Sequence, residues 1–241
     1  MHEVRHLDDE GPGSQNSLSD KIYARLRHAL MIGFYEPGIK ISIRSLAAAY
    51  QISPTPVREA VFQLIREGAL ELKLGHQPRV PVLTLERYIE IRETRAPLER
   101  LAAELAAVRI TPTEIAELRE LHAAYLAAEA RDGWKDALSL NQRFHFIICN
   151  AAGNATLLRT IENLWLLVGP FINNLYPRPE HFVRAVHPHL QLIDALERGS
   201  PAEAGDMAVR DLREGSITIL ERLKVGTEHT LASPALKRAR K

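Results

Sequence analysis

A chain of 241 residues with 46% hydrophobic residues is long and apolar enough for two modest domains with hydrophobic cores, and it is not a disordered protein. It contains no run of 18 or more apolar residues, and its acidic beginning differs from a signal peptide, so we expect a cytoplasmic protein without a membrane segment. The net charge of +1 is unevenly distributed, because residues 18–83 carry nine Lys and Arg against five acidic residues, whereas residues 84–241 carry 21 of each. The positive first part suits contact with phosphates.

The beginning of the chain predicts a tail followed by two helices. Residues 1–17 lack apolar periodicity, so we expect them to be disordered. From Leu18 apolar residues recur at helical spacing until Gly33 ends the pattern. A turn at residues 36–38 then leads to a short helix that runs to Tyr50, with Ser42 as its N-cap.

A third helix must begin near Pro54, because proline is tolerated only in a turn or in the first residues of a helix. From Val57 onward the apolar residues are spaced three and four apart, which places one stripe against a core. Thr55 and Arg58 lie off that stripe, in the first turn. Two short helices joined by the tight turn at residues 51–53 form a helix-turn-helix, whose second helix enters the major groove of DNA.

A β-hairpin is predicted next. Residues 70–74 and 78–82 alternate between apolar and polar side chains around Gly75. Pro81 restricts the second strand to an edge, because proline cannot donate a hydrogen bond. Three helices followed by a hairpin indicate a winged helix-turn-helix domain over residues 18–83.

The remainder of the chain is predicted to be helical, because no alternating apolar pattern is long enough for a strand. Residues 111–114 form a capping box with proline at the first helical position. Pro97 should kink or split the first of these helices, and Pro170 the fourth. The expected helices lie near 84–109, 112–131, 134–152, 155–175, 180–198 and 201–224. The fold class is therefore mainly α, with a helical-bundle domain at residues 84–225 and a basic, solvated tail at residues 226–241.

The first domain resembles the DNA-binding domain of the GntR family of bacterial transcription regulators. The resemblance rests on motifs that follow one another in order: Glu36-Pro37-Gly38, Ser45-Leu46-Ala47, residues 53–60 and Glu67-Gly68. It implies that residues of the second helix, the third helix and the wing contact double-stranded DNA: Arg44, Ser53, Thr55, Pro56, Arg58, Gly75 and Arg79. The family usually has arginine where this chain has Pro54, so one expected contact is missing. Taken alone, Arg44 and Arg58 would be ordinary solvated charges on a helix.

The second domain resembles the ligand-sensing FCD domain of the FadR-like subfamily of GntR regulators. The matching segments are residues 95–99, residues 141–145 and residues 189–196. The resemblance implies an all-helical domain that binds an effector and forms the dimer.

Four residues of the second domain form a candidate metal site. Asn141 and His145 are four residues apart on one helix and share a face. His189 and Asp211 each lie 11 residues from Ser200, so they stand level across an antiparallel helical hairpin. Two imidazoles, a carboxylate and an amide oxygen suit a divalent ion such as Zn²⁺, Ni²⁺ or Mn²⁺.

The FCD resemblance supports this metal site and also raises a doubt about it. The family commonly has Asp or Asn followed by three histidines, and its metal helps to hold a small carboxylate effector. Asp211 stands where the third histidine would be. Each histidine taken alone would be a hydrogen-bonded core or surface residue, and His187 is left outside the site.

Arg95 has two interpretations. A guanidinium can bind a carboxylate through two hydrogen bonds, which would make Arg95 an effector-binding residue. Arg95 can equally form an ion pair with Glu99, four residues further along the same helix.

These features together predict a homodimeric transcriptional repressor, without enzymatic activity, that binds a palindromic operator and responds to a small organic acid. One alternative is a metal-dependent hydrolase or lyase with an accessory DNA-binding domain, although no motif such as His-Glu-x-x-His supplies a base. The other alternative is a metal-free sensor of acyl ligands with the same fold.

Overall fold

The computed structural model describes residues 17–172 and 187–232, so the predicted N-terminal tail lies almost entirely outside the described residues. The described part is mainly α-helical, as predicted, and none of its helices is long and apolar enough to cross a membrane. Its helices are α1 (Leu18–Met31), α2 (Ile43–Tyr50), α3 (Pro54–Arg66), α4 (Leu85–Ala107), α5 (Pro112–Ala130), α6 (Trp134–Ala151), α7 (Ala155–Ile172), α8 (Pro188–Glu197), α9 (Pro201–Gly215) and α10 (Ile217–Ala232).

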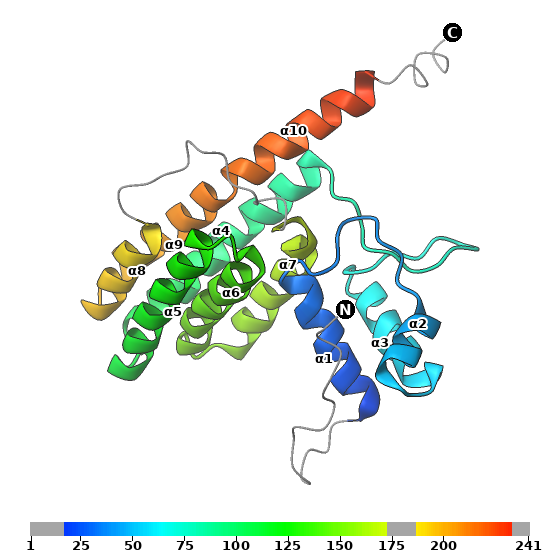
Figure 1. Ribbon diagram of the computed structural model, residues 1–241. Helices are drawn as coiled ribbons and strands as arrows, with labels where there is room; N and C mark the ends of the chain where they lie inside the picture. Colours follow the sequence, from blue (N-terminus) through cyan, green and yellow to red (C-terminus); the bar gives the residue numbers. More distant parts are fainter. Residues whose placement is uncertain (1–16, 173–186, 233–241) are drawn as a thin grey trace.

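The helix-turn-helix consists of α2 and α3, supported by α1 (Figure 1). The hydroxyl of Ser42 caps α2 by accepting a hydrogen bond from the backbone N–H of Ser45, as predicted. Ser53 is the N-cap residue of α3, and proline occupies the first helical position. The predicted apolar stripe of α3 is buried: Val57, Ala60, Val61 and Leu64.

The wing is smaller than the sequence predicts. The only pairing between residues 70–74 and 78–82 is an isolated bridge in which Glu71 and Arg79 exchange backbone hydrogen bonds of 2.9 Å. Pro81 lacks the N–H that the next hydrogen-bonded pair beyond Arg79 would need, which prevents a longer ladder on that side. A third segment that the sequence analysis missed pairs with the same stretch, because Lys40 also bridges Arg79.

The bundle helices pack mainly as α4 on α9, α5 on α6 and α8 on α9 (Figure 1). Pro97 was predicted to kink or split this helix, and it does not split it, since α4 continues across it. Pro97 is exposed, so water can reach the carbonyl that its missing N–H leaves unbonded. The single helix predicted near 201–224 is also wrong. It breaks at Ser216, whose hydroxyl bonds the carbonyl of Leu212 at the end of α9.

The end of the chain also differs from the prediction. The backbone remains helical through Gly226 as far as Ala232, so the predicted basic tail begins with the last seven residues of α10. Residues 233–241 lie outside the described ranges. The predicted helix near 180–198 is described only from Pro188, and His187 is its N-cap.

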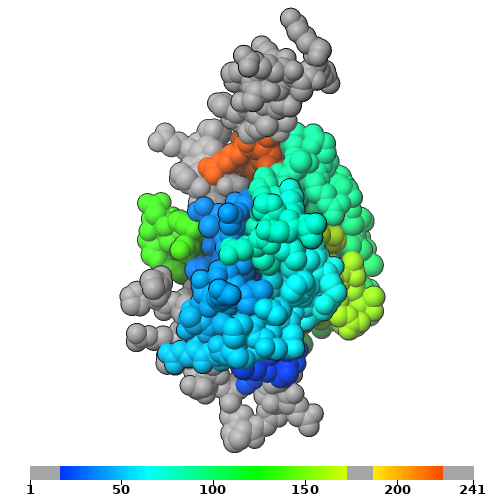
Figure 2. All heavy atoms as spheres, turned by 90° about the vertical axis from the view of Figure 1, so that its right-hand side faces the viewer, coloured from blue at the N-terminus to red at the C-terminus, as the bar shows by residue number. Residues whose placement is uncertain are grey.

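The winged part and the bundle pack directly on one another (Figures 1 and 2), and the contact is made by α1 and α7. Gly169 of α7 lies so close to the end of α1 that a Cβ there would stand 2.6 Å from Met31 Cα and would meet the carbonyl oxygen of Leu30. Arg27 and Glu162 form an ion pair of 3.2 Å across the same contact. One buried apolar core therefore runs through both parts, from Ile22 and Leu26 of α1 to Ile161 and Trp165 of α7.

Candidate functional site

The predicted DNA-binding residues lie on α2, α3 and the wing. Five of them are exposed: Arg44, Ser53, Thr55, Arg58 and Gly75. Pro56 and Arg79 are half-buried, and Arg79 is paired with Glu71 across the wing. Among the residues that the structure describes, neither Arg44 nor Arg58 has an acidic partner, so both guanidinium groups are available to phosphates or bases.

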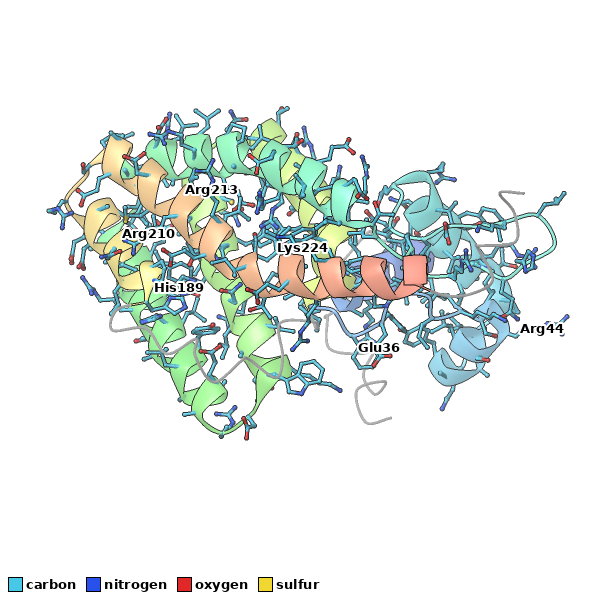
Figure 3. The ribbon with its side chains drawn as sticks, turned by 90° about the horizontal axis from the view of Figure 1, so that it is seen from above. Glu36, Arg44, His189, Arg210, Arg213 and Lys224 are labelled. Atoms are coloured by element: carbon cyan, nitrogen blue, oxygen red, sulfur yellow. The ribbon has the colours of Figure 1, made fainter. Side chains whose placement is uncertain are left out.

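A small cavity of about 100 Å³ lies inside the helical bundle. Four of the five residues predicted to bind metal or effector line it: Arg95 of α4, Asn141 and His145 of α6, and Asp211 of α9. The fifth, His189, lies against Asp211 near the start of α8. His189 lies within the helical bundle, whereas Arg44 lies at the far tip of the winged part (Figure 3), so the cluster and the predicted DNA-binding residues are well separated.

The geometry brings three of the four predicted metal ligands together. His145 Nε2 lies 3.2 Å from Asp211 Oδ2, and His189 Nε2 lies 3.8 Å from Asp211 Oδ1. One ligand atom from each of these residues lies within 4.8 Å of the others. Counting along the helical hairpin therefore placed His189 opposite Asp211 correctly. Asn141 shares the cavity with them.

The charges in this cluster are set by burial and by the short contacts. Burial alone raises the pKa of Asp211, but the attraction of His189 when it is protonated at low pH and the hydrogen bond from His145 outweigh it, so the pKa is lowered and the carboxylate is ionised at neutral pH. Burial lowers the pKa of His189 well below its usual value, although Asp211 opposes that shift. Neutral imidazole is the form that binds metal ions. The cluster thus offers one anionic and two imidazole ligands.

Of the two interpretations of Arg95, the structure tests the ion pair with Glu99. Its Nε donates a 2.7 Å hydrogen bond to Glu99 Oε1, and both side chains are only 7% exposed. The same oxygen accepts a hydrogen bond from the indole of Trp165, over whose ring the guanidinium lies at 4.5 Å. The predicted ion pair is present. Because none of the described residues accepts a hydrogen bond from the two Nη atoms of Arg95, the guanidinium can still offer them to the cavity.

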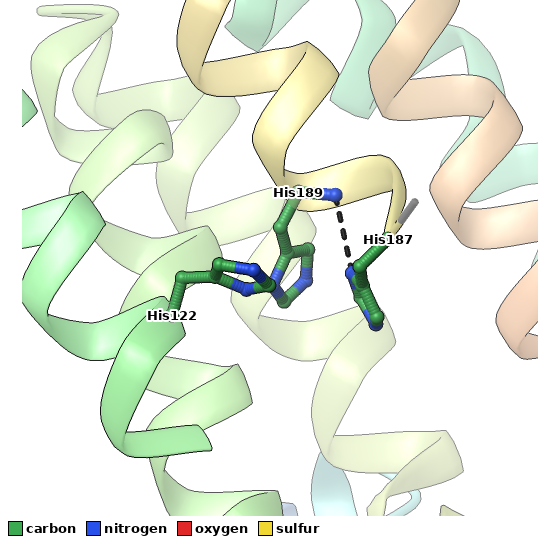
Figure 4. A group of neighbouring side chains, drawn as sticks. All are labelled: His122, His187 and His189. Carbon is green, nitrogen blue, oxygen red and sulfur yellow. Dashed lines mark hydrogen bonds between the residues drawn. The ribbon is translucent and has the colours of Figure 1, made fainter. Parts of the chain in front are cut away.

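Two further histidines, which the sequence did not predict to belong to the site, lie beside this cluster. His122 of α5 is 4% exposed, and neither of its ring nitrogens has a hydrogen-bond partner among the described residues. His187, which the sequence analysis set aside, lines the cavity and accepts a hydrogen bond from the backbone N–H of His189 (Figure 4). The position of His122 could have indicated it from the sequence, because it lies between Leu118 and Tyr125 on the buried face of α5. A polar side chain on such a face destabilises the fold unless it is hydrogen-bonded or binds a ligand.

Comparisons with known proteins identify the family of both parts of the chain. Residues 18–77 match the family described as bacterial regulatory proteins, gntR family, and residues 90–214 match the FCD domain. The HTH-type transcriptional regulator McbR of Escherichia coli K12 is 32% identical over 160 residues, which are 66% of this chain and 72% of that protein. The E. coli repressor RspR is 26% identical over 186 residues, 75% of this chain and 79% of that protein.

Solved structures show the same fold. The structure of E. coli McbR/YncC superposes with a TM-score of 0.80 at 28% identity and covers 86% of this chain and 99% of its own. A GntR regulator from Rhodococcus sp. RHA1, at 20% identity, superposes with a TM-score of 0.68 over 86% of this chain and 99% of its own, which speaks to the fold alone.

Proposed function

This chain belongs to the GntR family of bacterial transcription regulators and carries an FCD domain, and from that premise we propose a homodimeric repressor that releases a palindromic operator when a small organic acid binds. The proposal that the protein binds an effector rests on the cavity that Arg95, His145 and Asp211 line. An effector acts only if it binds one arrangement of the two parts of the molecule better than another.

The small cavity favours this proposal over an acyl sensor. A volume of about 100 Å³ holds an ion with a few waters or a short acid, whereas pockets for larger ligands measure roughly 300–1,000 Å³. The relatives named above are transcriptional regulators, which disfavours the alternative of a hydrolase with an accessory DNA-binding domain.

The residues around Asp211 fit a divalent ion. His145, His189 and Asp211 would hold it, with Asn141 beside them, and the buried nitrogens of His189 have no other hydrogen-bond partner in the described chain. A bound cation would offset the negative charge of an acid that enters the buried cavity. Arg95 would orient that acid through its free Nη groups.

Selection from random double-stranded DNA tests the proposal as a whole. We expect the full-length protein to recover palindromic sites and a gel shift on those sites to be reversed by a short carboxylic acid. Recovery of sites without two-fold symmetry, or binding that no acid alters at millimolar concentration, would contradict the proposal.

Arg58→Ala should weaken operator binding by about 1–3 kcal/mol if Arg58 reaches a base edge from the first turn of α3. Arg44→Ala should weaken binding to all DNA sequences alike. It should also reduce the slope of log affinity against log salt concentration by about one, the value expected for one lost phosphate contact. Both residues are exposed, so neither change should alter the melting temperature. Gel-shift titrations at several salt concentrations measure both effects, and wild-type affinity in both variants would disprove the docking of α2 and α3.

A two-fold operator requires two copies of the recognition helix, so we expect a dimer in solution. Light scattering coupled to gel filtration at micromolar protein should give about twice the mass of 27.1 kDa. A monomer that still protects both halves of the operator would refute this expectation.

His145→Ala should remove most of the Mn²⁺ bound by chelator-treated protein, because a carboxylate, an amide and two imidazoles suit this ion. His28→Ala, an exposed histidine of α1, is the matched control and should leave the stoichiometry unchanged. Elemental analysis after dialysis decides the question. Operator binding without effector should survive in both variants, since the proposed ligands lie on α6, α8 and α9 and none lies on α1, α2 or α3.

A further inference from the structure

A group of three histidines lies on the α5 side of the cavity, next to the cluster around Asp211. His122 comes from α5, His187 is the N-cap of α8, and His189 lies in the first turn of α8 (Figure 4). The ring centroids are 5.3 Å apart for His122 and His187, 5.5 Å for His122 and His189, and 4.3 Å for His187 and His189. One nitrogen from each ring lies within 4.8 Å of the other two.

The burial of His122 is unexplained by the protein alone. Its side chain is 4% exposed and that of His189 is 1% exposed, yet none of the four ring nitrogens has a hydrogen-bond partner in the described chain. Buried polar atoms almost always have a partner, and an unpaired one destabilises the folded state. Four such atoms in one place indicate that something else fills their lone pairs or accepts their protons.

We propose that His122, His187 and His189 form a second divalent-cation position, which takes imidazole-preferring ions such as Zn²⁺ or Co²⁺. Three histidines with an open fourth position are a common set for Zn²⁺. The position shares His189 with the cluster around Asp211, where a carboxylate and an amide favour a harder ion such as Mn²⁺. The bundle would thus hold two adjacent positions with different metal preferences, and His187 and Asp211 also line the cavity.

His187 connects this position to α8. Its Nδ1 accepts a 3.2 Å hydrogen bond from the backbone N–H of His189, so a neutral His187 carries its proton on Nε2. Coordination through Nε2 requires that the proton move to Nδ1, where it displaces the capping hydrogen bond. The number of protons on the ring stays the same. Binding of the ion therefore releases the cap of α8.

Two variants test the proposal in the full-length, chelator-treated protein. His122→Phe keeps a ring of similar size and removes two unpaired nitrogens, and His187→Ser keeps an oxygen that can cap α8. Each should weaken Zn²⁺ and Co²⁺ binding by more than about 100-fold, beyond the 10–100-fold typical of residues that only support a ligand. Each should leave Mn²⁺ binding within a few-fold of wild type. Asp211→Asn should show the opposite pattern, and His76→Ser, an exposed histidine in the wing, should change neither.

Competition titrations measure these affinities, and the visible absorption of Co²⁺ reports its ligands independently of any effect on DNA. The intense bands of a four-coordinate Co²⁺ should be present in wild type and absent in His122→Phe. Wild-type Co²⁺ affinity and absorption in both histidine variants would overturn the proposal. Loss of Zn²⁺ only in variants of His145 or Asp211 would overturn it while leaving the proposed function intact. A wild-type protein that binds no divalent ion would contradict the second position and the metal part of the proposed function together.

His122→Phe should fold, because an apolar ring replaces an unsatisfied one on a buried face. Circular dichroism should show wild-type helix content and a melting temperature no lower than that of wild type. If His122→Phe does not fold, the same titrations on His187→Ser, a change at a half-buried position, test the proposed second metal position.

Discussion

Gly169→Ala should destabilise the protein by about 3 kcal/mol, the upper part of the range for overpacked cores. The added Cβ would stand 2.6 Å from Met31 Cα and 2.7 Å from the carbonyl oxygen of Met31, in addition to meeting that of Leu30. These are backbone atoms at the end of α1, so no rotamer change can relieve the overlap. The two helices must move apart, and the apolar core between them must open.

Urea unfolding followed by far-UV circular dichroism measures the effect. Gly215→Ala is the matched control, because a Cβ at that position of α9 meets nothing within 4 Å. In a helix, alanine is favoured over glycine by roughly 0.8–1.0 kcal/mol, so Gly215→Ala should be neutral or stabilising. Equal stabilities for the two variants would show that α1 and α7 do not pack as closely as described. Gly169→Ala should also change operator affinity or the response to effector, since α1 supports α3.

Glu99→Ala should lower the free energy of unfolding by about 3–5 kcal/mol, because it leaves the buried guanidinium of Arg95 without its counter-charge. The indole N–H of Trp165 loses its acceptor at the same time. Glu104→Ala on the same helix is the control. Glu104 also pairs with an arginine four residues before it, but the side chains of Arg100 and Glu104 are 39% and 32% exposed. A pair of that kind contributes about 0–1 kcal/mol.

Thermal and urea unfolding of the two variants compare the buried pair with the exposed one. A double variant, Arg95→Met with Glu99→Leu, should recover much of the loss, since it removes both charges and keeps apolar volume. If Glu99→Ala were no more destabilising than Glu104→Ala, water would have to reach Arg95 through the cavity. That result would contradict the burial of the pair.

The sequence predicted those features that local rules determine. The start of α3 follows from prolines that fit only a first turn, and the cap of α2 follows from a serine before an apolar run. The proximity of His189 and Asp211 was predicted because two residues that are equally far from the turn of a helical hairpin lie at the same level along the two helix axes. In each case the information lies in a short stretch of residues or in one turn.

Features that depend on distant packing were missed. His122 is buried against residues of α8, about 65 positions further along the chain, and no pattern in the neighbouring sequence predicts that contact. The pairing of Lys40 with Arg79 joins segments separated by the whole helix-turn-helix. The break at Ser216 was missed because a glycine followed by a serine can either remain inside a helix or end it.

The apolar core that joins α1 and α3 to α7 has a thermodynamic consequence. Core residues such as Leu26 and Trp165 belong to one buried cluster, so neither part of the chain can lose its structure without exposing surface of the other. Calorimetry should therefore record a single cooperative transition, where a regulator whose two parts were joined only by a linker would show two. For the same reason the first 83 residues expressed alone would expose the face of α1 that α7 covers. That fragment should aggregate, and a cell would clear it before it could occupy an operator.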